Sequence, residues 1–483
     1  MKTMQGIRSL MPSLSALTAA LVLAGCASAP PTVAQHAGVA LPANFSAQAA
    51  AAGWTQAAPA EAQPRGAWWR VFADTELSAL VERAGEANTD VQTAAARLAE
   101  ARALLRSADA QRQPQIGASG GAARQAGANT ASGMQPATLV TAGLNFSYEA
   151  DLFGRLSRAS EAAREDANAR EALLQSTRLM VQADVAQTYL QLRSLQTERQ
   201  LVEQSLAAYR ETLRLIEKRY RAGDAAELDV ARMQTEVSAT EAETLALERQ
   251  QAALTHALAV LVGDVATGFT LASQPLLATL PVIPAGVPAT VLARRPDVSA
   301  AQASVLAAQA RVGVAQAAWF PAITLTGNGG YASPELGDLF KWSARSWGIG
   351  ALLSLPIFDG GQRAAQEEGA RARLEAAVAA QRGQVLAAFR DVEDQLSALR
   401  LLSGQARVLG QAVQSSERAT HLSDVRYRNG LVSQLELLDA RRNELRNRRQ
   451  ALQVRTAQYT ATVALIRALG GSWDSGETVA ASS

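Results

Sequence analysis

The sequence predicts a mainly α-helical protein with a small β part, built as two copies of one unit made of long coiled-coil hairpins. Three observations support this. The phrase RYRxG occurs twice, 207 residues apart, and supplies Tyr220, Gly223, Tyr427 and Gly430. A long stretch without proline or glycine, and its counterpart in the second copy, carry mostly apolar residues at alternating steps of four and three, which is the coiled-coil pattern. Short segments of alternating apolar and small residues have the period of β-strands.

The N-terminus is typical of a secreted lipoprotein. Residues 1–25 combine a basic start at Lys2 and Arg8 with an apolar stretch, as a signal peptide does. Small residues precede Cys26, the only cysteine, at the position that bacterial lipidation requires. An ordinary signal peptide with a chance cysteine is the alternative. We expect a lipid on Cys26. The residue after it is Ala27 and not aspartate, and by resemblance to other bacterial lipoproteins this implies the outer membrane.

The composition excludes several classes of function. Without Lys2 and Arg8 the chain holds 44 basic and 44 acidic residues, so nothing favours nucleic acid. Its three histidines are scattered, which argues against a metal site. It has no nucleophile elbow and no phosphate-binding glycine loop, so we expect no enzyme and no cofactor beyond the lipid on Cys26.

The repeat defines the expected domains. We assign residues 88–263 to the first copy and 295–470 to the second, because an ungapped offset holds throughout both. Residues 26–87 form a tether and an equatorial segment, with 27–64 rich in alanine, proline and glutamine. Residues 264–294 form a proline-containing linker, and 471–483 a tail.

Each copy is expected to open with a helix, over 89–112 and 296–319. Asp297 stands at the start of the second of these helices, and we assign it no chemistry. Two strand pairs follow, because apolar residues alternate with small or polar ones over 140–148 and 347–355, with partner strands near Ile116 and 323–326. About four strands per chain result.

A very long helix follows in each copy. The first runs over about 156–222 without proline or glycine, roughly 100 Å at the α-helical rise. Its expected seam is Val181, Val185, Thr188, Leu192, Leu195, Arg199, Val202, Leu206, Tyr209, Leu213, Ile216 and Tyr220. The equivalent second seam is Ala388, Val392, Gln395, Leu399, Leu402, Ala406, Leu409, Val413, Ser416, Thr420, Ser423 and Tyr427. Gly223 and Gly430 end these helices in a left-handed turn, and helices return over 225–262 and 433–470.

The second seam is smaller near its tip, because Ser416, Thr420 and Ser423 stand where the first has Tyr209, Leu213 and Ile216. Weakly packed elements are the ones that open. We therefore expect the second hairpin to move and the first to stay fixed. The alternative is that the hydroxyl groups bond to neighbouring helices and make the second tip equally rigid.

The strands leave two interpretations open. Four strands cannot close a barrel in a membrane, so insertion requires several chains to share one barrel. A soluble sheet packed on its apolar face is equally compatible with the pattern.

The repeat, the YxxG tips, SLPIFDGG at 354–361 and RRPDV at 294–298 resemble the TolC-type outer-membrane efflux factors. Within them, the chain is similar to the lipoprotein branch of OprM- and NodT-like proteins. The resemblance covers about 65–470. It implies a homotrimer with a shared twelve-stranded barrel in the outer membrane and a periplasmic α-barrel. It also implies a periplasmic adaptor that contacts the tips at Tyr220, Gly223, Tyr427 and Gly430, and an inner-membrane pump, often of the RND type.

The resemblance further implies an acidic periplasmic gate. Glu436 and Asp439 follow the second tip, and Asp229 follows the first, where Arg232 replaces the second acid. The simpler interpretation is that these carboxylates stabilise the first turns of their helices. The expected function is an efflux channel for small molecules. A lipid-anchored periplasmic scaffold without a pore, or a type I protein-secretion duct, are the alternatives.

Overall fold

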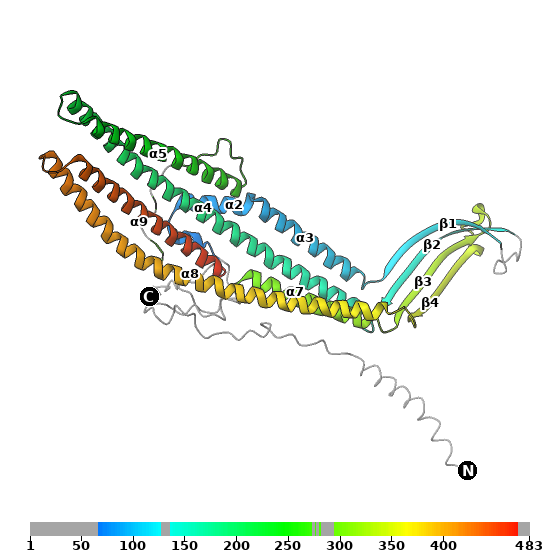
Figure 1. Ribbon diagram of the computed structural model, residues 1–483. Helices are drawn as coiled ribbons and strands as arrows, with labels where there is room; N and C mark the ends of the chain where they lie inside the picture. The colour runs from blue at the N-terminus through cyan, green and yellow to red at the C-terminus, as the bar shows by residue number, and fades with distance from the viewer. Residues whose placement is uncertain (1–65, 127–135, 273–275, 277–279, 282–293, 472–483) are drawn as a thin grey trace, which may run out of the picture. The chain divides into compact units, whose positions relative to one another are not determined.

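The computed structural model describes residues 66–126, 136–272, 276, 280–281 and 294–471 (Figure 1). The expected signal peptide, the lipidation site Cys26, the tether over 27–64, the C-terminal tail and most of the linker lie outside these residues.

The described elements repeat along the chain. The first copy contains α3 (Thr89–Ala110), β1 (Gln115–Gln125), β2 (Ala137–Ala150), α4 (Arg155–Arg221) and α5 (Glu227–Leu261). The second contains α7 (Pro296–Ala317), β3 (Ala322–Ser333), β4 (Arg345–Ser354), α8 (Gln362–Arg428) and α9 (Gln434–Ala468). Every helix of the first copy begins and ends 207 residues before its counterpart, which confirms the predicted two-fold repeat.

The long helices have the length and the seams that the sequence predicts. α4 and α8 have 67 residues each, roughly 100 Å at the α-helical rise. All seam positions of α8 are buried or half-buried. On α4 the same holds except at Tyr220, which is 44% exposed. The heptad pattern therefore identified the packed face of both helices.

The chain divides into two compact units. Unit 1 includes Leu98–Arg170 and Ala300–Arg382, and so contains the β-sheet with the helical segments next to it. Unit 2 includes the described parts of Val39–Arg97, Glu171–Ser299 and Gly383–Ser483, and so contains both hairpins. The long helices cross the boundary because each serves a strand region at one end and a hairpin at the other.

The sheet of unit 1 has four antiparallel strands in the order β1-β2-β3-β4, which leaves β1 and β4 as open edges. Its register aligns Ile116, Phe146, Gly327 and Ile349 across the sheet. Side chains at facing positions point to the same side, so most of the large apolar residues of the four strands share one face. Small and polar residues, such as Ser119 and Asn145, share the other. The predicted alternation is confirmed.

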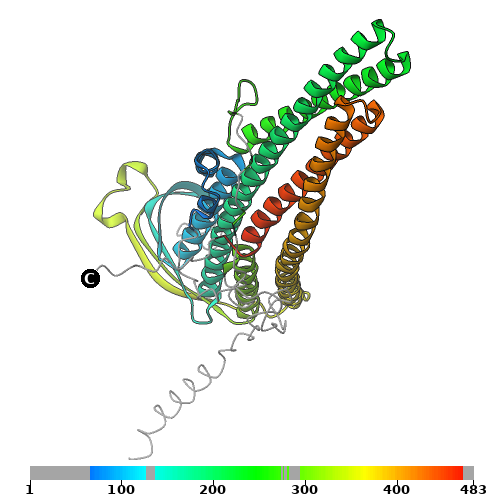
Figure 2. The same cartoon turned by 90° about the vertical axis from the view of Figure 1, so that its left-hand side faces the viewer.

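In unit 2 the four hairpin helices lie in the order α5, α4, α9, α8 (Figures 1 and 2). Leu206, Tyr209 and Ile216 of α4 pack with Met233 and Val237 of α5 and with Leu438 of α9. This apolar cluster joins the two hairpins near their tips.

Two elements before α3 are absent from the sequence prediction. A short 3-10 helix, η2 (Trp68–Phe72), buries Trp68, Trp69 and Phe72. Helix α2 (Thr75–Ala87) follows, and the Asp74 carboxylate accepts hydrogen bonds from the backbone amides of Glu76 and Leu77 at 2.9 Å. The apolar cluster and the capping aspartate were visible in the sequence. They precede the first copy as it was assigned, residues 88–263, so the offset was not applied to them.

Glycines end both returning helices next to the start of their own copy. Gly263 has φ +74°, and a Cβ there would lie 2.4 Å from the carbonyl oxygen of Ala87. In the second copy, a Cβ on Gly470 would lie 2.8 Å from the carbonyl oxygen of Arg294. Each copy is therefore closed by a backbone contact that only glycine permits.

We expect Gly263→Ala to destabilise unit 2 more than Gly223→Ala. The left-handed conformation alone costs an L-residue about 1–2 kcal/mol, and Gly223 has φ +84° with open space around its Cβ position. The backbone clash at Gly263 adds about 1–3 kcal/mol. Chemical denaturation in detergent measures the difference. Equal losses of stability in the two variants would contradict the contact.

Candidate functional site

The hairpin tips explain the repeated phrase RYRxG. At the first tip the amide of Gly223 donates to the carbonyl of Tyr220 at 2.9 Å, and that of Asp224 to Arg219 at 2.8 Å. At the second tip Gly430 donates to Tyr427 at 3.0 Å, and Leu431 to Arg426 at 2.9 Å. These two bonds with a left-handed glycine form a Schellman motif, which satisfies the last carbonyls of a helix. The phrase encodes the reversal of each long helix.

The acidic residues after the tips lie near arginines. Glu436, in the first turn of α9, approaches Arg426 of α8 at 4.0 Å, and its amide is capped by Ser433. Asp439 lies 3.8 Å from Arg442. Both side chains remain more than half exposed, at 53% and 58%. Their charges therefore stay accessible to solvent at the tip of the second hairpin.

Asp229 lies in the first turn of α5 and is half-buried. A carboxylate there suits the helix dipole, as the simpler interpretation requires. Within one chain, Asp229 and the pair Glu436 and Asp439 belong to different hairpins, each at the start of a returning helix.

A ladder of arginines on α9 holds the second hairpin against the first. Arg442 donates to Glu236 of α5 at 2.9 Å. One heptad further along α9, Arg449 donates to Glu198 of α4 at 2.8 Å and also bonds Glu243 of α5. This ladder is not apparent from the sequence, because a residue's partner on another hairpin cannot be identified from spacing alone.

The charges of the ladder support each other. The Glu236 carboxylate, through its hydrogen bond, raises the pKa of Arg442. Burial, followed by the neighbouring Glu236, raises the pKa of Tyr209 to about 12. Tyr209 is thus a neutral core residue beneath the ladder, and the arginines stay charged throughout the physiological range.

The two tips differ in packing as the sequence suggests. Tyr209 and Ile216 are each 1% exposed in the first hairpin. In the second, Thr420 and Ser423 are only half-buried. The Thr420 hydroxyl donates to the carbonyl of Ala440 on α9 at 3.1 Å, whereas Ser416 bonds within its own helix to Val413. The second seam thus exchanges apolar contact for these two hydrogen bonds, of which one crosses between helices.

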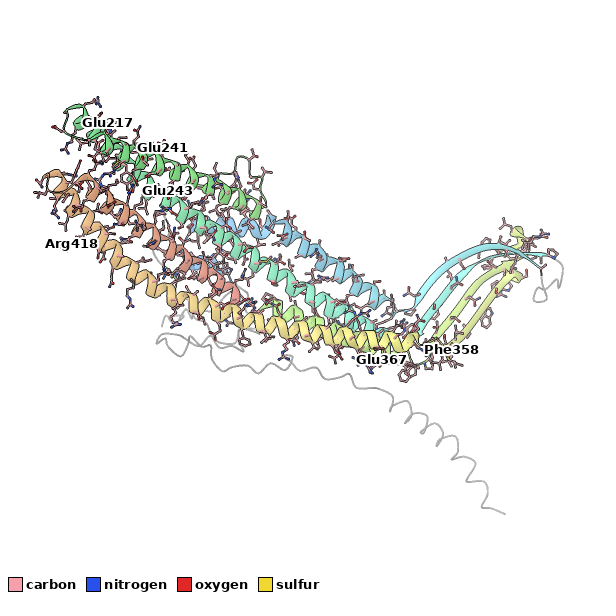
Figure 3. All side chains as sticks on the ribbon, in the orientation of Figure 1. Glu217, Glu241, Glu243, Phe358, Glu367 and Arg418 are labelled. Atoms are coloured by element: carbon pink, nitrogen blue, oxygen red, sulfur yellow. The ribbon has the colours of Figure 1, made fainter. Side chains whose placement is uncertain are left out.

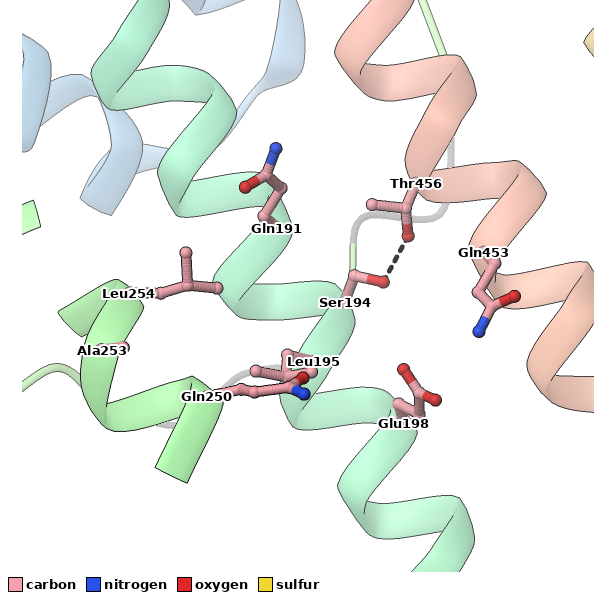
Figure 4. Close-up of a pocket in the computed structure, with 9 residues that line it drawn as sticks. All are labelled: Gln191, Ser194, Leu195, Glu198, Gln250, Ala253, Leu254, Gln453 and Thr456. Carbon is pink, nitrogen blue, oxygen red and sulfur yellow. Dashed lines mark hydrogen bonds between the residues drawn. The ribbon is translucent and has the colours of Figure 1, made fainter. Parts of the chain in front are cut away.

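A groove of about 450 Å³ interrupts the ladder (Figure 4). It opens between α4, α5 and α9, where a third arginine would follow Arg449 by one heptad but Thr456 stands instead. Thr456 hydrogen-bonds Ser194 of α4, and Gln250 and Gln453 also line the groove. The α9 helix is therefore held by ion pairs on the tip side of this groove and by a hydroxyl contact within it.

The motif RRPDV forms a buried ion-pair network. Asp297 accepts from the amide of Val298, as expected at a helix start. Arg295, with its side chain 8% exposed, donates to Asp297 at 2.7 Å, to Asp391 of α8 at 3.2 Å and to the last turn of α9 at the Ala468 carbonyl. The network ties three helices of unit 2 together. It was not visible in the sequence, because Asp391 is 96 residues away.

The apolar face of the sheet is open to its surroundings. Trp347 is 78% exposed, Ile349 85% and Leu353 64%. At the junction with α8, Ile357 and Phe358 are 94% and 90% exposed, and Figure 3 labels Phe358 there. A contiguous apolar surface of this kind marks a membrane or a protein contact.

Within the described ranges, no helix combines the length and the apolar character that crossing a membrane demands. The same residues contain no group of three or more histidine, cysteine, aspartate or glutamate side chains that could hold a metal ion.

Comparison with known proteins gives the family. The model of the outer membrane efflux protein family matches residues 80–264 and again 287–471. Outer membrane protein OprJ of Pseudomonas aeruginosa is 34% identical over 96% of this chain and 97% of its own. The pyoverdine export outer membrane protein OpmQ of the same species is 32% identical, over 96% of this chain and 98% of its own.

Solved structures agree. The outer-membrane channel OprN superposes with a TM-score of 0.84 and 30% identity, covering 93% of this chain and all of its own. The outer membrane protein VceC of Vibrio cholerae superposes with a TM-score of 0.79 and 30% identity, covering 84% of this chain and 99% of its own. The chain therefore belongs to the outer membrane efflux protein family, and it is an outer-membrane channel of a tripartite efflux system, a transport protein and not an enzyme.

Proposed function

We propose that three copies of the chain join their sheets edge to edge into one closed barrel in the outer membrane. The observation that carries this is the sheet of unit 1, which has two open edges, one apolar face and one face of small and polar residues. Unpaired strand edges are not tolerated in lipid, and four strands cannot close on themselves. Joining copies closes the barrel, directs the apolar face to lipid and lines a wet lumen with the other.

Planar bilayers test the channel directly. The purified protein should give discrete conductance steps, and light scattering in detergent should give the mass of three chains. A pore-free periplasmic scaffold would leave the bilayer silent. A type I secretion duct would conduct but would export a protein when coupled to its pump in cells.

The periplasmic end is proposed to be a gate formed by the hairpin tips. Three-fold symmetry would turn Glu436, Asp439 and Asp229 each into a ring of acids, which favours cations and narrows the mouth electrostatically. The exposure of Glu436 and Asp439 and the lighter packing of the second hairpin support this role. When the gate opens, the second hairpin would separate from the first, and the ion pairs of Arg442 and Arg449 between the two hairpins would break.

We expect Arg449→Ala to raise the resting conductance of the channel, because it removes a contact that holds α9 to both helices of the first hairpin. Arg448→Ala is the matched control. It removes one arginine from the neighbouring position, but among the residues that the structure describes Arg448 pairs only with Glu417 and Glu444 of its own hairpin. Single-channel recordings and uptake of a large antibiotic by cells measure the leak. A leak of the same size in both variants would contradict the ladder's role.

The exported cargo is proposed to be small molecules, delivered by a proton-driven inner-membrane pump of the RND type through a periplasmic adaptor that grips the tips. Relatives named for antibiotic, toluene and solvent efflux support this cargo class. Export of a fluorescent drug by cells with the complete system should stop when the proton gradient is collapsed. Export that survives loss of the proton gradient but stops when ATP is depleted would indicate another class of pump.

The anchor is proposed to be a lipid on Cys26. We expect Cys26→Ser to abolish palmitate labelling of the purified protein and to leave part of it unprocessed or unanchored. Efflux should survive in part, since a barrel holds the assembly in the membrane by itself. Label that persists in the serine variant would contradict the lipid anchor on Cys26.

A further inference from the structure

A cavity of about 530 Å³ lies within unit 1, between the first turns of α4 and α8 and the last turns of α7. Three arginines line it, Arg155 on α4, Arg311 on α7 and Arg373 on α8, and Asp166 of α4 is the acid among the lining residues. The rest of the lining is mostly alanine, so the cavity combines guanidinium groups with apolar surface. We call this cavity the arginine groove. Its volume is that of a site for a small molecule, about 300–1,000 Å³.

The arginine groove lies on the same side of unit 1 as the polar face of the sheet. An adjoining hollow shares Arg155 with the groove and is also lined by Glu149, Ala322 and Ser354. Glu149 follows Asn145 by four residues on β2, and Ala322 precedes the β3 partner of Asn145 by six, so both lie on its face. Ser354 pairs with Ala322 and shares that face. In the proposed barrel the polar face lines the lumen, and the groove therefore opens into the tunnel.

The arginines of the groove keep donors free for a ligand. Arg155 donates to both carboxylate oxygens of Glu149, at 2.8 and 2.7 Å, and its side chain is still 41% exposed. Arg311 pairs with Asp166 and is 49% exposed. Arg373 forms no ion pair with any residue that the structure describes. A guanidinium has five N–H donors, so the groove offers a net positive charge and several unused donors.

The repeat provides an internal comparison for these positions. At the offset of 207 residues, Gln362 of α8 is the equivalent of Arg155, and Leu104 of α3 is the equivalent of Arg311. The helices concerned have the same lengths in both copies. The fold of the wall therefore does not require arginine at either position, and the positive charge is particular to one of the two equivalent places.

We propose that the arginine groove is a transit site for organic anions, exported molecules that carry a carboxylate, sulfonate or phosphate on an apolar body. The inference rests on the proposed shared barrel and names a class of cargo for it. Arg373 supplies the unpaired charge, and the free donors of Arg155 and Arg311 complete the contact with the anionic group. Planar guanidinium forks suit such groups, because they form two parallel hydrogen bonds with them. The apolar body lies on the alanine surface.

The exposure of the groove fits transit better than retention. The side chains of Arg155 and Arg311 are nearly half exposed, so water and salt weaken their attraction for an anion. A conducting pathway needs sites that bind well enough to admit a molecule and weakly enough to release it. The acidic residues near the tips act on entry into the tunnel, whereas the groove acts on molecules that have already entered.

Dye binding to the purified full-length protein tests the site. Carboxyfluorescein carries carboxylates on a planar ring system, and rhodamine 6G has the same ring system with a positive charge. In non-ionic detergent at low salt, fluorescence anisotropy should show carboxyfluorescein binding that weakens as salt is added. Arg373→Gln should raise the Kd for carboxyfluorescein about ten-fold, because it removes a charged donor, and should not weaken binding of rhodamine 6G.

Arg371→Gln is the matched control. Arg371 lies two residues before Arg373 on α8, with its side chain 62% exposed, and it pairs with Glu367, which Figure 3 labels. Glu367 accepts a hydrogen bond from the indole of Trp319 on α7 at 2.9 Å, and none of these three residues lines the groove. The variant removes the same charge from the same helix, so it should leave the Kd for carboxyfluorescein within about two-fold of that of the natural protein.

Thiol labelling tests whether the groove faces the tunnel. A bulky methanethiosulfonate reagent should lower the single-channel conductance of Arg373→Cys and leave that of Arg371→Cys unchanged. The natural chain, treated in the same way, controls for Cys26. Equal changes of conductance in the two cysteine variants would overturn the placement of the groove, and with it the transit site.

The outcomes separate this inference from the proposed channel. Equal weakening of carboxyfluorescein binding by Arg371→Gln and Arg373→Gln would overturn the groove as the anion site. A natural chain that conducts but does not bind the dye would overturn it as well and leave the channel in place. A chain that binds the dye with the expected dependence on Arg373 but gives no conductance would overturn the proposed channel instead.

Discussion

Arginine in place of Ile349 is expected to prevent most of the protein from inserting into the outer membrane. Ile349 lies in the middle of β4, 85% exposed on the apolar face. A charged side chain directed at lipid costs about 2–4 kcal/mol near the bilayer midplane, and each copy in a shared barrel adds the same cost. Outer-membrane fractionation and heat-modifiable mobility on gels measure the inserted fraction.

Neighbouring positions provide the control for this prediction. Gly350 follows Ile349 but belongs to the opposite face, so Gly350→Arg should leave insertion near normal and reduce conductance. Leu353 on the apolar face and Leu352 on the opposite face are leucines of similar exposure, 64% and 61%, so their arginine variants repeat the comparison with one residue type. The cost at Leu353 should be smaller than at Ile349, because it lies near the strand end. Equal damage on both faces would argue for a soluble sheet.

Removing the Arg295 side chain is expected to cause the largest loss of stability in unit 2. Arg295→Ala leaves the carboxylates of Asp297 and Asp391 without the guanidinium that joins them. Breaking a buried ion pair from one side costs about 3–5 kcal/mol. Denaturant unfolding in detergent measures it. Arg390→Ala, whose side chain is 70% exposed, is the control and should cost less than about 1 kcal/mol.

One of the Arg295 contacts, the hydrogen bond to the end of the returning helix, has an equivalent in the first copy. Asn88 occupies the equivalent position and donates to the carbonyl of Leu261 at 2.9 Å, as Arg295 does to Ala468. Arg295→Asn should therefore retain the helix-end contact and lose only the ion pairs. A stability equal to that of Arg295→Ala would show that the helix-end contact contributes little.

The network also predicts the direction of an acid effect. Burial acts to raise the pKa of Asp297, but Arg295, the Val298 amide and Gln384 outweigh it, and the pKa lies below its ordinary value. A depressed carboxyl pKa contributes stability above the unfolded pKa of about 3.9, and this stability is lost as the pH falls through the folded value. The stability difference between the natural chain and Arg295→Ala should accordingly shrink below about pH 4.

Much of the architecture could be predicted because it depends on periodicity. Heptad spacing identified the seam of α4 and α8, alternation identified the two faces of the sheet, and the 207-residue offset gave every helix of the second copy from the first. The left-handed glycines at the tips, Gly223 and Gly430, followed from the same repeat. Such features are local, so a single sequence contains them.

Features outside the repeat, or between distant segments, were missed. The η2 and α2 elements precede the first copy as it was assigned, residues 88–263, and the sequence analysis placed them in the segment 26–87 without predicting a helix there. The partners of Arg442, Arg449 and Arg295 are chosen by packing among helices far apart in the chain. Many acidic residues on neighbouring helices were possible partners for each arginine, and spacing could not choose among them.

The sequence by itself determined the repeat, the long helices, the four strands with their two faces, and the glycine turns at the tips. Each follows from the period of one element or from the conformational freedom of one residue. Only the tertiary structure decided that α9 lies against both α4 and α5, and that α5 and α8 are left as the free edges. Pairwise contacts between helices depend on which faces meet and at what height. Those quantities arise from the packed chain as a whole, because a charge or a knob has no partner until the backbone brings one within reach.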